Sequence, residues 1–169
     1  MRPEEWLERR AHLDFDAYLE EIRKRCFICA LRDHDPEFEQ THIVLETSEA
    51  IAFLDEYPNV FGHVLVVSRE HREDVIGDFT EDEYLALQRI VRRVGAAVQR
   101  VVPCERLYVL SLGSAAGNSH VHWHLVPCPP GLPFERQQIA LLRKEEDGYI
   151  DVPDDEMAAL ASRLRDALD

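Results

Sequence analysis

Three histidines within five positions, His120-Val121-His122-Trp123-His124, constrain the fold of this chain more than any other feature. The intervening residues are apolar, and the segment has the composition of a β-strand. Because alternate side chains of a strand share one face, the three imidazoles point to one side and Val121, Trp123 and Leu125 to the other. A helix would rotate successive rings by about 200° and scatter them. The pattern therefore predicts a strand with three histidines on one face.

Four further segments carry strand signals, and one carries a long helical pattern. The strand segments are rich in β-branched and apolar residues, and they lie at residues 41–47, 50–55, 63–68 and 107–112. Thr80 and Glu83 form a capping box, and the helix that they begin ends near Val102, before Pro103. We predict an α+β fold, in which a five-stranded antiparallel sheet has a long helix between its third and fourth strands.

Helical patterns also flank this central part of the chain, at residues 4–25, 135–144 and 153–168. Their apolar residues recur at roughly helical spacing among many charges. We therefore divide the chain into three parts: an N-terminal helical extension (residues 1–25), a central domain (residues 26–131) and a C-terminal helical extension (residues 132–169).

The chain is strongly acidic, with 33 Asp and Glu against 19 Lys and Arg and a formal net charge of −14. Such a surface repels nucleic-acid backbones and anionic lipids, so neither is an expected partner. Between Leu107 and Phe134 there is no Asp, Glu, Lys or Arg. A phosphate bound to this segment must therefore be held by histidines, backbone N–H groups and polar loop side chains.

Signals for export or membrane insertion are not found in the sequence. The N-terminus has no apolar stretch typical of a signal peptide, and no segment has the ~18–20 apolar residues of a membrane helix. We expect a cytoplasmic protein whose four cysteines remain reduced.

A loop of small residues, Gly113–Gly117, precedes the histidine strand. Its backbone N–H groups can approach a phosphate without obstruction by side chains. A histidine nucleophile beside such donors indicates phosphoryl or nucleotidyl transfer. Two other interpretations remain open at this point: the histidines line a solvated sheet face, or they bind metal by themselves.

Two sequence blocks resemble the histidine triad superfamily of nucleotide hydrolases and transferases. The segment His120–Pro127 is similar to the His-φ-His-φ-His-φ-φ signature, where φ is apolar. The segments Ala52–Pro58 and Gly62–Val67 resemble the ribose-binding strand, turn and third strand of the family. The resemblance covers roughly residues 26–128. It implies an antiparallel sheet with a long helix, a homodimer with one continuous sheet, and a small nucleotide substrate.

The resemblance also implies roles for individual residues. His122 corresponds to the nucleophile, which attacks the α-phosphorus and forms a covalent nucleotidyl-histidine. His124 corresponds to a phosphate ligand, and Asp55 to the residue that binds the ribose hydroxyls. The implied substrates are dinucleoside polyphosphates or nucleoside phosphoramidates, and the acceptor is water or another group such as phosphate.

The chain departs from the family pattern in two places. The loop Gly117–His120 is two residues tighter than usual, so either Asn118 or Ser119 can face the leaving group. No Arg follows the triad in residues 126–131. These departures favour an alternative function, a nucleotide-sensing binding module with little turnover. A third hypothesis is a metal-binding or scaffold protein.

Cys26 and Cys29 have the spacing of a zinc knuckle. The alternatives are a redox pair, for which the strand pattern supplies no βαβ context, and two buried structural thiols. Some histidine triad proteins have a similar N-terminal pair that binds zinc. The resemblance implies that His71 and His120 complete a structural tetrahedral zinc site, with His63 as the competing third ligand.

Overall fold

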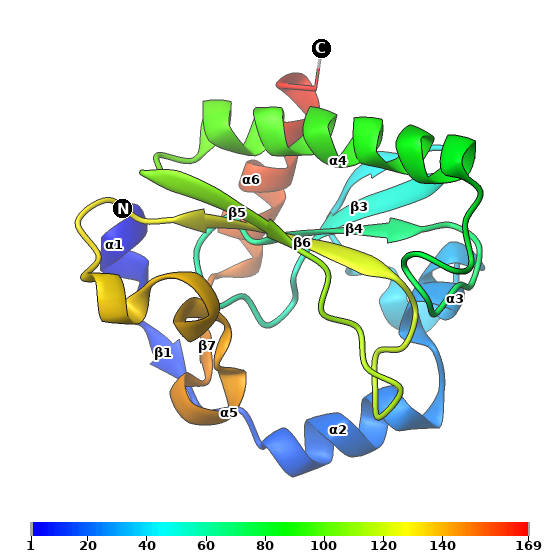
Figure 1. Cartoon of the computed structure of the whole chain (residues 1–169). Coiled ribbons are helices and arrows are strands. Elements are labelled where there is room, and N and C mark those ends of the chain that lie inside the picture. The colour runs from blue at the N-terminus through cyan, green and yellow to red at the C-terminus, as the bar shows by residue number, and fades with distance from the viewer. Residues whose placement is uncertain (1, 169) are drawn as a thin grey trace.

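The computed structural model describes residues 2–168 and has an α+β fold built on a five-stranded antiparallel sheet. Figure 1 shows one long helix across one side of this sheet and several short elements on the other. The strands lie in the order β2-β3-β4-β6-β5, with bounds β2 (Ile43–Glu46), β3 (Ala50–Leu54), β4 (Val64–Ser68), β6 (His122–Cys128) and β5 (Arg106–Leu110). The predicted fold class is confirmed.

The long helix α4 (Glu81–Val101) connects β4 to β5, as predicted. Its capping box forms: Thr80 Oγ1 accepts a hydrogen bond from Glu83 N, and the Glu83 carboxylate accepts one from Thr80 N. Such caps contribute about 1 kcal/mol to helix stability. The chain leaves β4, crosses the sheet in α4 to the edge strand β5, and returns through β6 between them.

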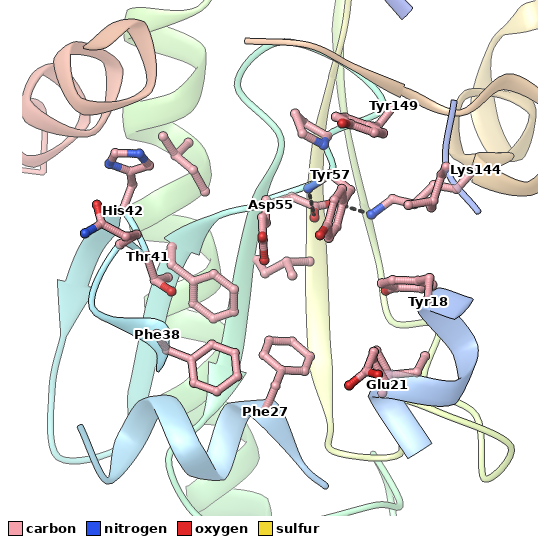
Figure 2. Close-up of a pocket in the computed structure, with 18 of the residues that line it drawn as sticks. Tyr18, Glu21, Phe27, Phe38, Thr41, His42, Asp55, Tyr57, Lys144 and Tyr149 are labelled. Atoms are coloured by element: carbon pink, nitrogen blue, oxygen red, sulfur yellow. Dashed lines mark hydrogen bonds and ion pairs between the residues drawn. The ribbon is translucent and has the colours of Figure 1, made fainter. Parts of the chain in front are cut away.

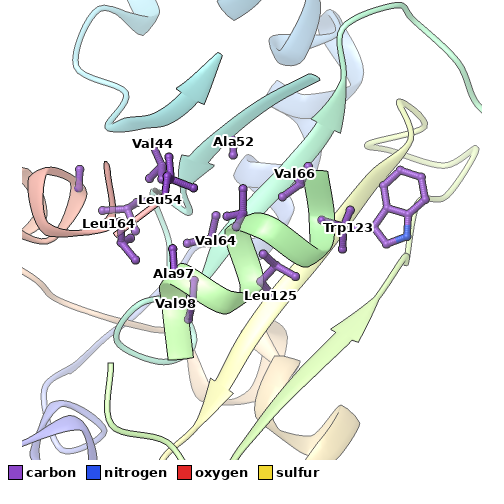
Figure 3. Close-up of a cluster of buried hydrophobic side chains, with 14 of the residues drawn as sticks. Val44, Ala52, Leu54, Val64, Val66, Ala97, Val98, Trp123, Leu125 and Leu164 are labelled. Carbon is purple, nitrogen blue, oxygen red and sulfur yellow. The ribbon is translucent and has the colours of Figure 1, made fainter. Parts of the chain in front are cut away.

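The sheet is buried on both faces because strand residues alternate between two hydrophobic clusters. Ala52, Val66 and Leu125 pack against α4 and the C-terminal helix α6 (Asp154–Asp166), and Figure 3 shows this cluster. Phe53 and Leu65 point to the opposite face, against helix α3 (Phe27–Arg32) and the short 3₁₀-helix η1 (Pro36–Phe38). Both faces of the central strands are therefore covered, and β6 carries its histidines on the α3 side.

The prediction of one helix over residues 4–25 was wrong. The segment forms three elements, α1 (Pro3–Trp6), β1 (Arg10–Ala11) and α2 (Phe15–Lys24). Asp14 starts α2 by accepting a hydrogen bond from Ala17 N at 3.1 Å. β1 pairs with β7 (Tyr149–Ile150), so tertiary pairing overrides the helical pattern.

The prediction of one helix over residues 135–144 was also wrong. This segment contains η2 (Phe134–Arg136), η3 (Gln138–Leu142) and the start of α5 (Lys144–Asp147). Gln138 has a φ of 58°, which interrupts a right-handed helix. The Gln137 amide donates to Leu132 O and Glu105 Oε1 and ties the segment to the end of the sheet. The helix predicted at residues 153–168 is confirmed as α6.

Within residues 2–168, none of the helices combines the length and the apolar character required to cross a membrane.

Candidate nucleotide and metal sites

The three histidines of the triad lie on one face at the start of β6. His122 and His124 belong to the strand, and their ring centroids are 4.9 Å apart. His120 lies just before the strand and is 1% exposed. Trp123 and Leu125 pack on the α4 side. This is the alternation that the sequence predicts.

A backbone hydrogen bond orients the ring of His122. Its Nδ1 lies 2.7 Å from the carbonyl oxygen of His120, so Nδ1–H must donate and Nε2 keeps its lone pair. Burial of the ring lowers the pKa of His122 and favours the neutral form. A neutral imidazole with a fixed lone pair is a nucleophile that needs no further activation.

A chain of contacts runs from His124 to Asp55. His124 Nδ1 and His63 Nε2 share a hydrogen bond of 3.0 Å. His63 Nδ1 lies 3.1 Å from Asp55 Oδ2, without the alignment of a hydrogen bond. Burial lowers the pKa of His63 to about 4, and burial also lowers that of His124, so both rings are neutral near pH 7. His63 is thus engaged away from the two cysteines.

Asp55 lies just after β3 and has a partner that sequence reasoning missed. Its Oδ2 is 2.8 Å from Nζ of Lys144 in α5, and its Oδ1 accepts a hydrogen bond from Tyr57 N at 3.1 Å. Burial opposes ionisation of the carboxyl, but Lys144, together with His63 and His124, outweighs burial and holds the pKa of Asp55 well below its usual range. Asp55 is therefore a buried carboxylate that faces a lysine.

These side chains line a cavity of about 1130 Å³, large enough for a nucleotide-sized ligand. Figure 2 shows Asp55 and Lys144 at one end, beside Tyr18, Tyr57 and Tyr149. The apolar end is formed by residues of α3, η1 and the neighbouring strands, namely Phe27, Leu31, Phe38, Phe53 and Leu65. His122 and His124 also line this cavity.

Asn118 lines both the large cavity and a smaller one next to Cys26, whereas Ser119 lines only the smaller one. Asn118 lines the same cavity as His122, and its Nδ2 donates to the hydroxyl of Tyr18 at 3.3 Å. Its buried Oδ1 has no hydrogen-bond partner among the described residues. Ser119 does not line the cavity of His122, and its Oγ donates to Glu73 Oε1 at 2.8 Å.

The four residues expected to bind a metal lie together. One ligand atom from each of Cys26, Cys29, His71 and His120 falls within 4.8 Å of the others. The two cysteines come from the N-terminal turn of α3, where Cys26 Sγ accepts from Cys29 N. The histidines come from the segment after β4 and from the start of the triad. The fold therefore joins three distant segments at one point.

The hydrogen bonds of both histidines leave a lone pair directed at the thiols. His120 Nε2–H donates to Ser68 O at 2.7 Å, and its Nδ1 lies 3.3 Å from Cys26 Sγ. His71 Nε2 lies 3.0 Å from Glu73 Oε1, and its Nδ1 lies 3.3 Å from Cys29 Sγ. Carboxylate or carbonyl support of this kind is typical of metal-bound histidines.

The two thiols are also suitable ligands for a metal cation. When only protein groups surround it, burial and the neighbouring thiol of Cys26 raise the pKa of Cys29 to about 11. A divalent metal reverses this effect and stabilises both thiolates. Two thiolates and two imidazoles are a common tetrahedral donor set for Zn²⁺, and the residues present are compatible with that ion.

Comparison with known proteins agrees with the fold and the triad. Residues 37–130 match the model of the HIT domain. A HIT-like protein of Saccharolobus solfataricus is 33% identical over 108 residues, which cover 60% of this chain and 73% of that protein.

Two solved structures share the fold. A histidine triad nucleotide-binding protein of Sulfolobus tokodaii has a TM-score of 0.66 and 24% identity, covering 85% of this chain and 91% of that one. A zinc-bound histidine triad family protein of Mycobacterium smegmatis has a TM-score of 0.64 and 22% identity, covering 86% and 94%. By its sequence and its fold, this chain belongs to the HIT-domain family.

Proposed function

We propose that the protein is a nucleotide hydrolase or nucleotidyl transferase that acts at the α-phosphate of a nucleoside phosphate derivative. The observation that carries the proposal is His122 in a nucleotide-sized cavity, with Nδ1–H bonded to the His120 carbonyl and the Nε2 lone pair available. Membership of the HIT-domain family supports nucleotide chemistry in general. The substrate classes are dinucleoside polyphosphates and nucleoside phosphoramidates.

The reaction has two displacement steps. His122 Nε2 attacks the α-phosphorus, the N–P bond forms, and the P–O or P–N bond to the leaving group breaks. A phosphate leaving group departs as an anion, whereas an amine takes a proton from water. Water then attacks the same phosphorus, the N–P bond breaks, and a nucleoside monophosphate is released. Another acceptor, such as phosphate, would give a transferase in place of a hydrolase.

The remaining groups bind and orient the nucleotide. Asp55 accepts hydrogen bonds from the ribose hydroxyls, and the aromatic end of the cavity around Phe27 and Phe53 holds the base. His124 contacts the phosphate. Asn118 faces the leaving group, since its Oδ1 is unpaired and it lines the cavity, whereas Ser119 is bonded to Glu73.

Zinc has a structural role in this proposal. Cys26, Cys29, His71 and His120 hold the ion, which ties α3 and the segment after β4 to the start of β6. The zinc-bound relative from Mycobacterium smegmatis supports this assignment. A closed four-ligand site supplies folding energy and orientation rather than a reactive metal position.

We further propose a cytoplasmic homodimer that binds small nucleotides and neither nucleic acid nor membranes. The net charge of −14 disfavours phosphate polymers and anionic lipids. β5 is an edge strand, and Val109 and Leu112 on and beyond it are about half exposed. Pairing of two such edges would extend the sheet. Light scattering tests this: a mass of twice 19.6 kDa is expected, and a monomer at all concentrations contradicts it.

The activity is tested with a substrate panel. Release of nucleoside monophosphate is measured from dinucleoside polyphosphates and nucleoside phosphoramidates, for the wild type and for His122→Ala. We expect turnover by the wild type and at least a 10³-fold loss in the variant. Tight nucleotide binding by calorimetry without any product would favour the sensing module instead.

A further inference from the structure

Lys144 is a partly buried cation in a place that neither the triad nor the metal cluster explains. It comes from α5 in the C-terminal segment, its side chain is 15% exposed, and its Nζ lies 2.8 Å from Asp55 Oδ2. The Asp55 side chain is 8% exposed. Figure 2 shows the Lys144 side chain extended toward Asp55, with Tyr57 beside the contact and Tyr18 nearby.

The contact occupies the atoms that a ribose would need. Asp55 Oδ1 accepts from Tyr57 N, and Oδ2 faces both Lys144 Nζ and His63 Nδ1. A pair of sugar hydroxyls that donates to this carboxylate competes directly with Lys144. A lysine that loses its carboxylate inside a cavity needs another anionic partner, because an unpaired buried charge is costly.

The bound nucleotide itself offers that partner. Residues 107–134, which include the triad and its loop, contain no Lys or Arg. The other basic residues that line the described part of this cavity, Lys24 and Arg25, are more exposed and are ion-paired on the surface, with Glu21 for the lysine and with Asp35 and Glu37 for the arginine. Lys144 is therefore the basic side chain best placed to meet phosphate oxygens near His122.

We propose that Lys144 is a specificity-determining residue that exchanges Asp55 for the phosphate chain of the bound nucleotide. This inference rests on the proposed function and adds a preference to it: substrates with at least two linked phosphates bind better than the nucleoside or the monophosphate. The cation that the segment after the triad lacks is thus supplied by the C-terminal extension. The exchange also predicts that the nucleoside alone gains nothing from Lys144, because it must displace the lysine without giving it a new partner.

The test compares binding of three ligands that share one base. Adenosine, AMP and the α,β-methylene analogue of ADP, whose P–C–P link resists cleavage, are titrated by calorimetry; the guanosine series is run in parallel. The proteins are the wild type, Lys144→Gln, Lys144→Arg and the matched control Arg143→Gln. Arg143 is the neighbouring basic residue, but it pairs with Glu146 at the surface and does not line the cavity.

We expect Lys144→Gln to weaken binding of the diphosphate analogue about tenfold or more, the usual size of a lost hydrogen bond to a charged group. Adenosine should bind as well as before or better. Lys144→Arg should keep the preference for the diphosphate, and Arg143→Gln should match the wild type. Lys144→Met repeats the test if glutamine lowers the melting temperature below the titration temperature.

Two outcomes overturn the inference. Equal losses of affinity for adenosine and the diphosphate analogue would mean that Lys144 only stabilises the structure of the cavity. No loss of affinity for either ligand would mean that Lys144 remains paired with Asp55. In both cases the wild type still binds nucleotides, and the proposed function survives. A wild type that binds neither series would refute the proposed function and this inference together.

Discussion

His120 and His122 are joined through the backbone: the carbonyl oxygen of His120 accepts the Nδ1–H of His122 at 2.7 Å. The ring of the same His120 lies 3.3 Å from Cys26 Sγ, within the metal cluster. One residue therefore belongs to both sites. Its side chain is part of the candidate metal-binding cluster, and its main chain sets the tautomer of His122.

Loss of the metal should weaken the fold and then the activity. Cys26→Ser removes one of the four ligands, and we expect elemental analysis to fall from one zinc per chain to well below one, with a lower melting temperature. His122→Ala should retain its zinc, because His122 lies outside the cluster. Loss of zinc from His122→Ala, or two metals per chain in the wild type, would indicate a metal-centred chemistry.

The stability of the protein should depend on pH through His63. Burial lowers the pKa of this histidine from 6.5 to about 4, so the unfolded chain binds its proton first as the pH falls. The contribution of His63 to the free energy of unfolding should therefore decrease between pH 6.5 and pH 4, by roughly 3 kcal/mol. Urea unfolding across this range should give a flatter profile for His63→Asn. Equal slopes for variant and wild type would show that other groups cause the decline.

Asp55→Asn should reduce the distinction between ribose and deoxyribose. The amide can accept one hydroxyl, but it lacks the charge that strengthens these hydrogen bonds, so a loss of about tenfold in ribonucleotide affinity is expected. A 2′-deoxynucleotide should lose less. The substitution also leaves Lys144 with an uncharged partner, so the melting temperature should be recorded alongside. Identical losses for the two sugars would place the ribose elsewhere.

The segment that carries Lys144, formed by α5 and β7, should be sensitive to substitution at Gly148. This residue ends α5 with a φ of 67°, and a Cβ there would lie 2.1 Å from the carbonyl oxygen of Ala11 in β1. Gly131 has a similar φ of 76° with open space around it, and it serves as the control. Gly131→Ala should cost about 1 kcal/mol in unfolding free energy, and Gly148→Ala clearly more, since the β1–β7 pair must also separate. Equal costs would mean that the β1–β7 pair adds little to stability.

The central sheet could be predicted from the sequence because its signals are local. Alternation around Trp123 defines the two faces of β6, and Thr80 with Glu83 marks the start of α4. The four residues expected at the metal site also lie together in the structure. These features depend on strand period, capping chemistry and the resemblance to a known family.

The terminal segments could not be predicted, because their structure depends on contacts distant in the sequence. β1 exists through its pairing with β7, and Arg10 and Ile150 in that pair are far apart in the chain. Lys144 is separated from Asp55 by 89 positions, and its own neighbours are typical of a solvated helix end. A local pattern cannot reveal that one lysine of an acidic, exposed segment turns into a cavity.

The most direct test of the proposed mechanism is mass spectrometry of protein denatured rapidly during turnover of a dinucleoside polyphosphate. Because phosphorus–nitrogen bonds to histidine are acid-labile, the protein is denatured and kept at neutral or basic pH. We expect an added mass of one nucleoside monophosphate on the peptide that contains His122, and none in His122→Ala. An adduct on another residue, or steady product release without any adduct while the variant keeps its rate, would contradict it.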